Sequence, residues 1–133
     1  MKRLHILYTL LFIWLLPVTS NGQPAGKEKL RVISYNIWNG FEHDASRRAN
    51  FINWIKGQQP DILAMTELVG FTEKDLGQLA SEYGHKYYAI VKEEGYPVGI
   101  TSNKPITVVK KQVEDFWHGM LHVKTYGLDI IVT

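Results

Sequence analysis

Two polar side chains of this sequence stand at the ends of apolar segments that have the length of β-strands. Asn36 ends the apolar run of segment 30–40, and Glu67 ends that of segment 59–68. One helix-like stretch separates the segments, so the two strands would run parallel and end at the same edge of a sheet. A carboxylate beside an amide oxygen suits a hard cation such as Mg²⁺ or Mn²⁺. The alternative is that Asn36 caps a turn and Glu67 is a solvated strand end.

The elements that would position these residues follow from composition and periodicity. Residues 30–37 are rich in β-branched side chains and predict the first strand. Asp44 is a suitable N-cap for a helix from 45 to about 56, with Gly57 as its C-terminal stop. Residues 61–67 are nearly all apolar, which predicts a central strand buried on both faces.

The rest of the chain reads as one more helix followed by short strands. Residues 72–75 resemble a capping box, with Asp in place of Glu, and open a helix that Gly84 closes. An antiparallel meander is predicted beyond this helix. Its strands are 87–91, 98–101, 106–113, 120–124 and 128–133.

Taken together, these segments resemble the endonuclease/exonuclease/phosphatase (DNase I-like) superfamily, which includes nucleases, inositol phosphatases and bacterial sphingomyelinases. The resemblance is carried by segments 30–40, 59–68, 96–106 and 127–133. It places Asn36 on the asparagine of the family's first motif and Glu67 on its metal-binding glutamate. Thr66 is a departure, because family members usually carry Gln there, although its hydroxyl can still donate a hydrogen bond.

The resemblance implies an α/β fold: the N-terminal half of a four-layer α/β/β/α sandwich, with βαβα followed by the strand meander. The domain would occupy residues 30–133 and be truncated at its C-terminus, because the family's later His, Gly-Asp-x-Asn and Ser-Asp-His motifs do not occur after 129–133. Only one sheet's worth of strands is then expected, with its inner face exposed. We expect the 133-residue chain alone to be inactive.

Two further residues are candidates for substrate binding. Asn39 lies in the loop after the first strand, where it can contact substrate or a metal-bound water, or simply form a turn with its neighbours. His118 is a candidate phosphate contact, with packing as the alternative. His122 lies four residues beyond it, and on a strand the two would be about 13 Å apart, too far to share one ion.

The N-terminus has the pattern of an export signal. Lys2 and Arg3 precede an uncharged run over 6–18, which predicts a signal peptide over 1–22 and a flexible leader over 23–29. An uncleaved anchor is the alternative. The sequence contains no Cys, which excludes a lipid-anchored lipoprotein and a disulfide framework. We predict a secreted or periplasmic protein with no stable membrane span after processing.

The charge balance does not favour a nucleic-acid surface. The formal net charge is +2, and loss of Lys2 and Arg3 with the signal would bring it to zero. Binding to nucleic acid needs a clustered basic patch, so nucleic acid stays a possible partner that charge does not support. The predicted partner is a phosphoester substrate of unknown type.

The resemblance implies metal-assisted hydrolysis of a phosphoester, with Mg²⁺ or Mn²⁺ held by Glu67 and steadied by Asn36. Both residues are thus candidate catalytic and metal residues. Two other classes of function remain open. One is an exported, non-catalytic ligand-binding module on the same fold. The other is a small structural domain that self-associates through its exposed sheet face.

Overall fold

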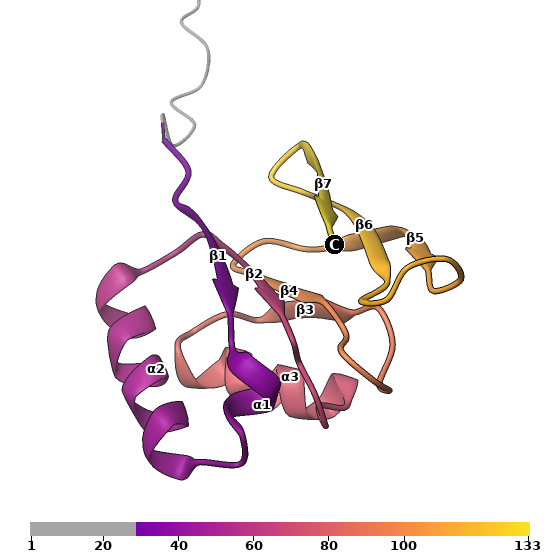
Figure 1. Cartoon of the computed structure of the whole chain (residues 1–133). Coiled ribbons are helices and arrows are strands. Elements are labelled where there is room, and N and C mark those ends of the chain that lie inside the picture. Colours follow the sequence, from indigo (N-terminus) through magenta and orange to yellow (C-terminus); the bar gives the residue numbers. More distant parts are fainter. Residues whose placement is uncertain (1–28) are drawn as a thin grey trace, which may run out of the picture.

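The computed structural model describes residues 29–133. The predicted signal peptide over 1–22 and all but the last residue of the leader lie outside the described residues. The described chain forms a mixed α/β structure with two β-sheets (Figure 1). The elements in order are β1 (Val32–Asn36), α1 (Trp38–Phe41), α2 (Ala45–Gln58), β2 (Ile62–Thr66), α3 (Glu73–Glu82), β3 (Tyr87–Ile90), β4 (Gly99–Ser102), β5 (Thr107–Gln112), β6 (Met120–Thr125) and β7 (Leu128–Val132).

The first sheet contains four strands in the order β1-β2-β4-β3. β1 and β2 are parallel, as the sequence predicts, and Asn36 is in register with Thr66. β4 pairs with β2 in the antiparallel direction, and β3 pairs with β4. The parallel pair brings the carboxyl ends of β1 and β2 to one edge of the sheet, where Asn36 and Glu67 lie.

β2 is buried on both faces, which confirms the prediction for this strand. Leu63 and Met65 pack with buried residues of α2 and α3. Ile62 and Ala64 point to the other face and belong to a second core. Side chains alternate across a strand, so this one element joins two hydrophobic layers.

The second sheet is antiparallel, in the order β5-β6-β7, and it covers the face of the first sheet away from the helices (Figure 1). Leu121 and Val123 of β6 and Val132 of β7 pack there against β2 and β4. The prediction of a single sheet with an exposed inner face is therefore wrong. The predicted antiparallel meander is also divided in two. β3 and β4 belong to the first sheet, where β4 pairs with β2, and β5 starts the second sheet.

The helix signals are mostly confirmed. The Asp44 carboxylate accepts hydrogen bonds from the N–H groups of Ser46 and Arg47, and Thr72 and Asp75 form a full capping box. Gly57 does not end its helix. α2 continues to Gln58, and the left-handed residue that ends it is Gln59, with φ 47°.

Within residues 29–133, no helix has the length and apolar composition that crossing a membrane requires.

Candidate functional site

The carboxylate of Glu67 is held by two neutral hydrogen-bond donors. The Asn36 side-chain nitrogen Nδ2 donates to Oε1 at 2.8 Å, and the backbone N–H of Asn39 donates to Oε2 at 3.0 Å. These two hydrogen bonds, that of Asn36 first, lower the pKa of Glu67 below its ordinary value, and the charge of His118 adds to the effect. Glu67 therefore stays ionised at neutral pH.

Asn36 is itself fixed in orientation. Its amide oxygen Oδ1 accepts a hydrogen bond from the backbone N–H of Trp38 at 2.7 Å, so its NH₂ group must face Glu67. Asn36 thus orients the carboxylate through its nitrogen while its oxygen faces the loop. The turn that the sequence offered as an alternative role for Asn36 is present, and it serves the same arrangement.

The loop after β1 has an unusual backbone. Every residue from Trp38 to His43 has a positive φ, including Gly40 at 62°, so α1 is a left-handed turn. Left-handed backbone costs a residue of L configuration roughly 1–2 kcal/mol, and such strain tends to cluster at functional sites. Glu67 also has a positive φ, of 59°.

Gly40 joins this loop to the segment after β2. Its N–H donates to the carbonyl oxygen of Glu67 at 2.9 Å. A Cβ at Gly40 would lie 2.0 Å from the carbonyl oxygen of Val69, so only glycine fits there. The close approach of these two loops sets the backbone N–H of Asn39 against the Glu67 carboxylate.

The donor set fits a hard divalent cation. Each Glu67 oxygen accepts one of the hydrogen bonds given above and keeps lone-pair capacity for a further partner. Among residues 29–133 no group of three or more His, Cys, Asp or Glu side chains is arranged to hold a metal. Glu67 is the carboxylate that could bind a cation at this place, and water would complete the shell in the way Mg²⁺ prefers.

His118 lies near this carboxylate, and His122 serves elsewhere. His118 Nδ1 is 3.0 Å from the carbonyl oxygen of Tyr96, and the next residue, Pro97, accepts a hydrogen bond at 3.0 Å from the N–H of Leu68. His122 of β6 instead pairs with Asp129 of β7 at 2.7 Å. The two histidines therefore engage different partners.

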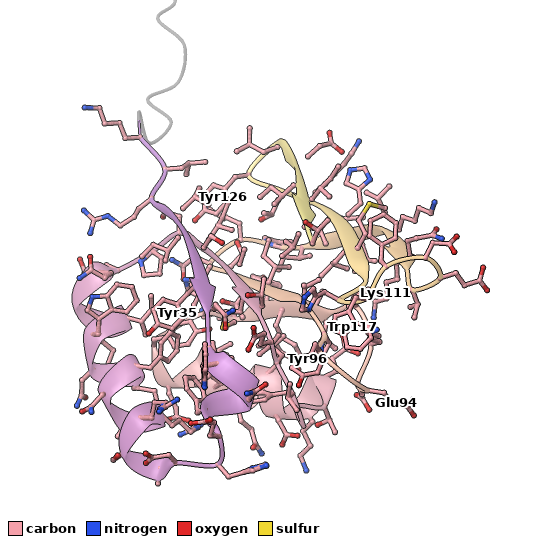
Figure 2. The ribbon with its side chains drawn as sticks, in the orientation of Figure 1. Tyr35, Glu94, Tyr96, Lys111, Trp117 and Tyr126 are labelled. Atoms are coloured by element: carbon pink, nitrogen blue, oxygen red, sulfur yellow. The ribbon has the colours of Figure 1, made fainter. Side chains whose placement is uncertain are left out.

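The sequence analysis did not identify Tyr96 and Trp117 as neighbours of the candidate site. Their rings stack with centroids 6.1 Å apart at an interplanar angle of 29°, and Figure 2 shows them side by side. The signal was available, because Trp117 directly precedes His118 in a short turn that begins with the acidic residues Glu114 and Asp115.

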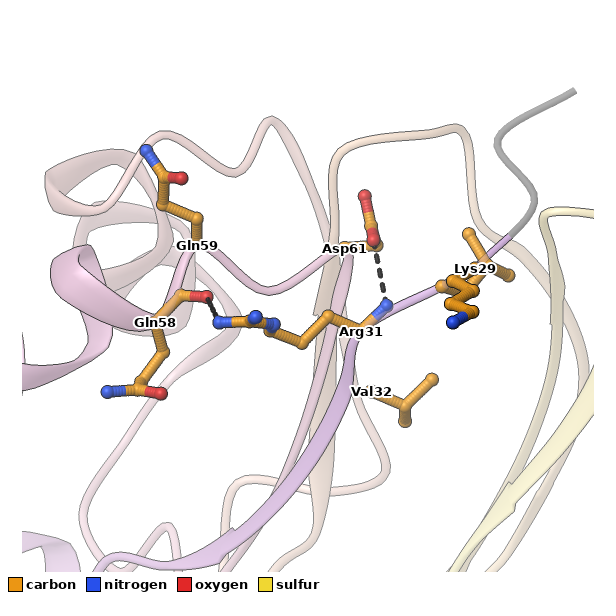
Figure 3. Close-up of a pocket in the computed structure, with 7 residues that line it drawn as sticks. Lys29, Arg31, Val32, Gln58, Gln59 and Asp61 are labelled. Carbon is orange, nitrogen blue, oxygen red and sulfur yellow. Dashed lines mark hydrogen bonds between the residues drawn. The ribbon is translucent and has the colours of Figure 1, made fainter.

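The surface has two hollows, which lie at different places relative to Glu67. One, of about 570 Å³, lies at the amino ends of β1 and β2, where Arg31 donates to the Gln58 carbonyl oxygen and to the Asp61 carboxylate (Figure 3). It is at the opposite edge of the sheet from Glu67. The other, of about 380 Å³, is lined by the left-handed turn and by Gly70 and Phe71 after β2.

Comparison with known proteins identifies the family to which a chain with this fold belongs. The model of the endonuclease/exonuclease/phosphatase family matches residues 33–131, and the chain belongs to this family. Its members are hydrolases of phosphoester bonds and generally use divalent metals.

Three solved structures share the fold. An AP endonuclease from Archaeoglobus fulgidus is 25% identical, with a TM-score of 0.56, over 77% of this chain and 40% of that one. A D. rerio TDP2 humanized by 14 mutations is 15% identical, with a TM-score of 0.53, over 77% and 47%. A truncated Caenorhabditis elegans TDP2 is 21% identical, with a TM-score of 0.53, over 77% and 43%.

The chain thus spans less than half the length of each of these structures. No curated protein matches the sequence.

Proposed function

We propose that this chain is part of an exported phosphoester hydrolase that depends on Mg²⁺ or Mn²⁺. The observation that carries the proposal is the Glu67 carboxylate, kept ionised and oriented by Asn36 and Asn39 at the carboxyl edge of the parallel strands. Ligand sites of open α/β sheets lie at this edge. The family supports phosphoester hydrolysis, and the segment from Lys2 through 6–18 supports export.

Each residue of the site has a distinct task in this proposal. Glu67 holds the cation, and Asn36 with the backbone of Asn39 keeps both carboxylate oxygens in place. A bound divalent cation supplies Lewis-acid polarisation of a phosphoryl oxygen and offsets its negative charge. His118, half-buried beside this carboxylate, contacts the phosphate, and Asn39 lies where it can contact substrate.

The test compares variants in the protein encoded by the complete gene. Glu67→Gln removes a charge from the cation and should lower turnover of bis-p-nitrophenyl phosphate by at least a hundredfold. Asn36→Ala should have a smaller effect, because the carboxylate remains. Glu82→Gln, at the end of α3 and paired with Arg48, is the matched control and should change turnover by less than about twofold. Full activity in EDTA would overturn the metal assignment.

A second readout does not depend on activity. Mn²⁺ broadens NMR signals close to where it binds, so titration into this chain should first broaden the amides of Asn39 and Glu67. The effect should disappear in Glu67→Gln. Broadening that begins elsewhere, or that survives the substitution, would refute the proposed ligand.

Export is tested separately by mass spectrometry of the N-terminus of protein recovered from the periplasm or medium. We expect a start near residues 21 to 23. Intact Met1 in cytoplasmic protein would refute export.

A further inference from the structure

An exposed aromatic surface lies next to the candidate metal site. We call it the aromatic ledge, and it consists of Tyr96, Trp117 and His118. Tyr96 stacks against Trp117, and the His118 ring meets Tyr96 edge-on, at an interplanar angle of 90°. The Trp117 side chain is 76% exposed, so Tyr96 supports it while most of the indole faces solvent.

Backbone hydrogen bonds tie the ledge to the candidate site. The residue after Glu67 donates its N–H to Pro97, which directly follows Tyr96. His118, directly after Trp117, has its Nδ1 3.0 Å from the Tyr96 carbonyl oxygen. A group bound at Glu67 therefore has the ledge as its neighbour.

Trp117 differs from the tryptophan of α2 in a way that points to a ligand. Trp54 packs against Tyr35, with ring centroids 5.3 Å apart, and against Phe51 at 6.4 Å, so packing accounts for it. Trp117 has a ring contact with Tyr96 and is the most exposed large hydrophobic residue within residues 29–133. Lys92 donates to its backbone carbonyl oxygen at 2.9 Å.

The exposed indole face favours a ligand that carries a planar ring. The ammonium group of Lys92 donates to the Trp117 carbonyl oxygen. Glu93, Glu94, Glu114 and Asp115 lie close by in the sequence, so the ring rather than the charge of a ligand is what this surface can select. An indole face stacks well on a nucleobase or another planar ring, whichever base it is.

We propose that Trp117 stacks on a planar ring, such as a nucleobase, of the phosphoester bound at Glu67. Trp117 is then a specificity residue: it selects substrates in which a ring adjoins the reacting phosphate. This inference rests on the proposed function, because the phosphate is placed by the Glu67 site.

The test measures binding to this chain in the presence of Mg²⁺. Adenosine 5′-monophosphate and ribose 5-phosphate share sugar and phosphate and differ in the base. We expect the nucleotide to bind about tenfold more tightly, within the range of one stacked base. Trp117→Leu should remove this preference, Trp117→Phe should keep most of it, and Trp54→Leu, the matched control, should leave it unchanged.

The outcomes separate this inference from the function on which it rests. Equal affinities in the parent chain, a preference that survives Trp117→Leu, or tighter binding of phosphocholine than of the nucleotide would each overturn the role of Trp117. A base preference that depends on Trp117 but not on Mg²⁺ or Glu67 would support stacking and refute the metal-dependent function.

Discussion

Neutral donors hold the Glu67 carboxylate and lower its pKa. An amide and a backbone N–H stabilise its charge, so the carboxylate keeps its full attraction for a cation. A lysine or arginine in the same place would lower the pKa too, but it would compete with the metal. Neutral donors thus orient the carboxylate and do not compete with a cation for binding to it.

A first prediction follows for Asn36. In Asn36→Ala the largest cause of the lowered pKa is removed, so the pKa of Glu67 should rise toward its ordinary value of 4.5. Metal binding should then weaken at a higher pH than in the parent chain. Carbon-13 NMR titration of the Glu67 carboxyl measures this, with Asn50→Ala on the exposed side of α2 as control. An unchanged pKa would show that the Asn36 hydrogen bond does not form in solution.

His85 predicts a pH dependence of stability. This side chain is 3% exposed, with Nε2 2.9 Å from the Pro60 carbonyl oxygen and Nδ1 2.8 Å from the Thr101 hydroxyl. A carbonyl oxygen only accepts, so Nε2 carries a proton, while the Thr101 hydroxyl can donate to Nδ1. Burial lowers the pKa of His85 below the ordinary 6.5.

The sign of this effect is fixed by linkage. Below about pH 6.5 the unfolded chain binds a proton at position 85 that the folded chain does not, so the free energy of unfolding should fall as the pH falls. Urea denaturation at pH 7.5, 6.5 and 5.5 measures the slope. His85→Gln should flatten it, whereas His43→Gln on the exposed loop should not. A folded-state pKa at or above 6.5 by NMR would contradict the prediction.

At the scale of elements, the loop after β1 decides whether the site exists. Gly40→Ala forces a Cβ against the Val69 carbonyl oxygen in a left-handed conformation. We expect lower stability and loss of Mn²⁺ binding at Glu67, because the two loops must separate.

The matched control is Gly57→Ala in α2. A Cβ there meets nothing within 4 Å, and Ala in place of a helical Gly typically stabilises by about 0.5–1 kcal/mol. Denaturation of both variants gives the comparison. Equal stability of the two would show that the loops do not approach as closely as the structure places them.

Local signals in the sequence were sufficient for most elements. The caps Asp44 and Thr72 marked the starts of α2 and α3, and the apolar run before Glu67 marked β2. The signals for two strands joined by a helix also placed Asn36 and Glu67 at one edge of the first sheet, because parallel pairing follows from a helical crossover. The left-handed turn escaped prediction, since Trp38 and Phe41 have no preference for positive φ and only packing against the next loop imposes it.

At the scale of the whole molecule, stability depends on the contact between the two sheets. Leu121 of β6 is fully buried between them. Leu121→Ala should lower the free energy of unfolding by about 2–5 kcal/mol, the range for buried leucines. Leu128→Ala, at a position 45% exposed on β7, should change it by about 0.5 kcal/mol or less.

Chemical denaturation of this chain tests both variants. Similar losses in the two would mean that the sheets do not share a core in solution. The division into two sheets could not be predicted from the sequence, because local patterns do not specify the strand with which β4 pairs. Only the long-range pairing of β4 with β2 separates them.

The left-handed turn from Trp38 to His43 has a consequence for chirality. An amino acid of D configuration prefers the backbone region that this turn occupies, so mirror-image residues would relax a stretch that natural ones strain. We therefore expect Gly, Asn and Asp to be tolerated at these positions and Val, Ile and Thr to lower stability. The left-handed backbone of this turn therefore restricts which side chains can lie beside Glu67, independently of any restriction that substrate binding imposes.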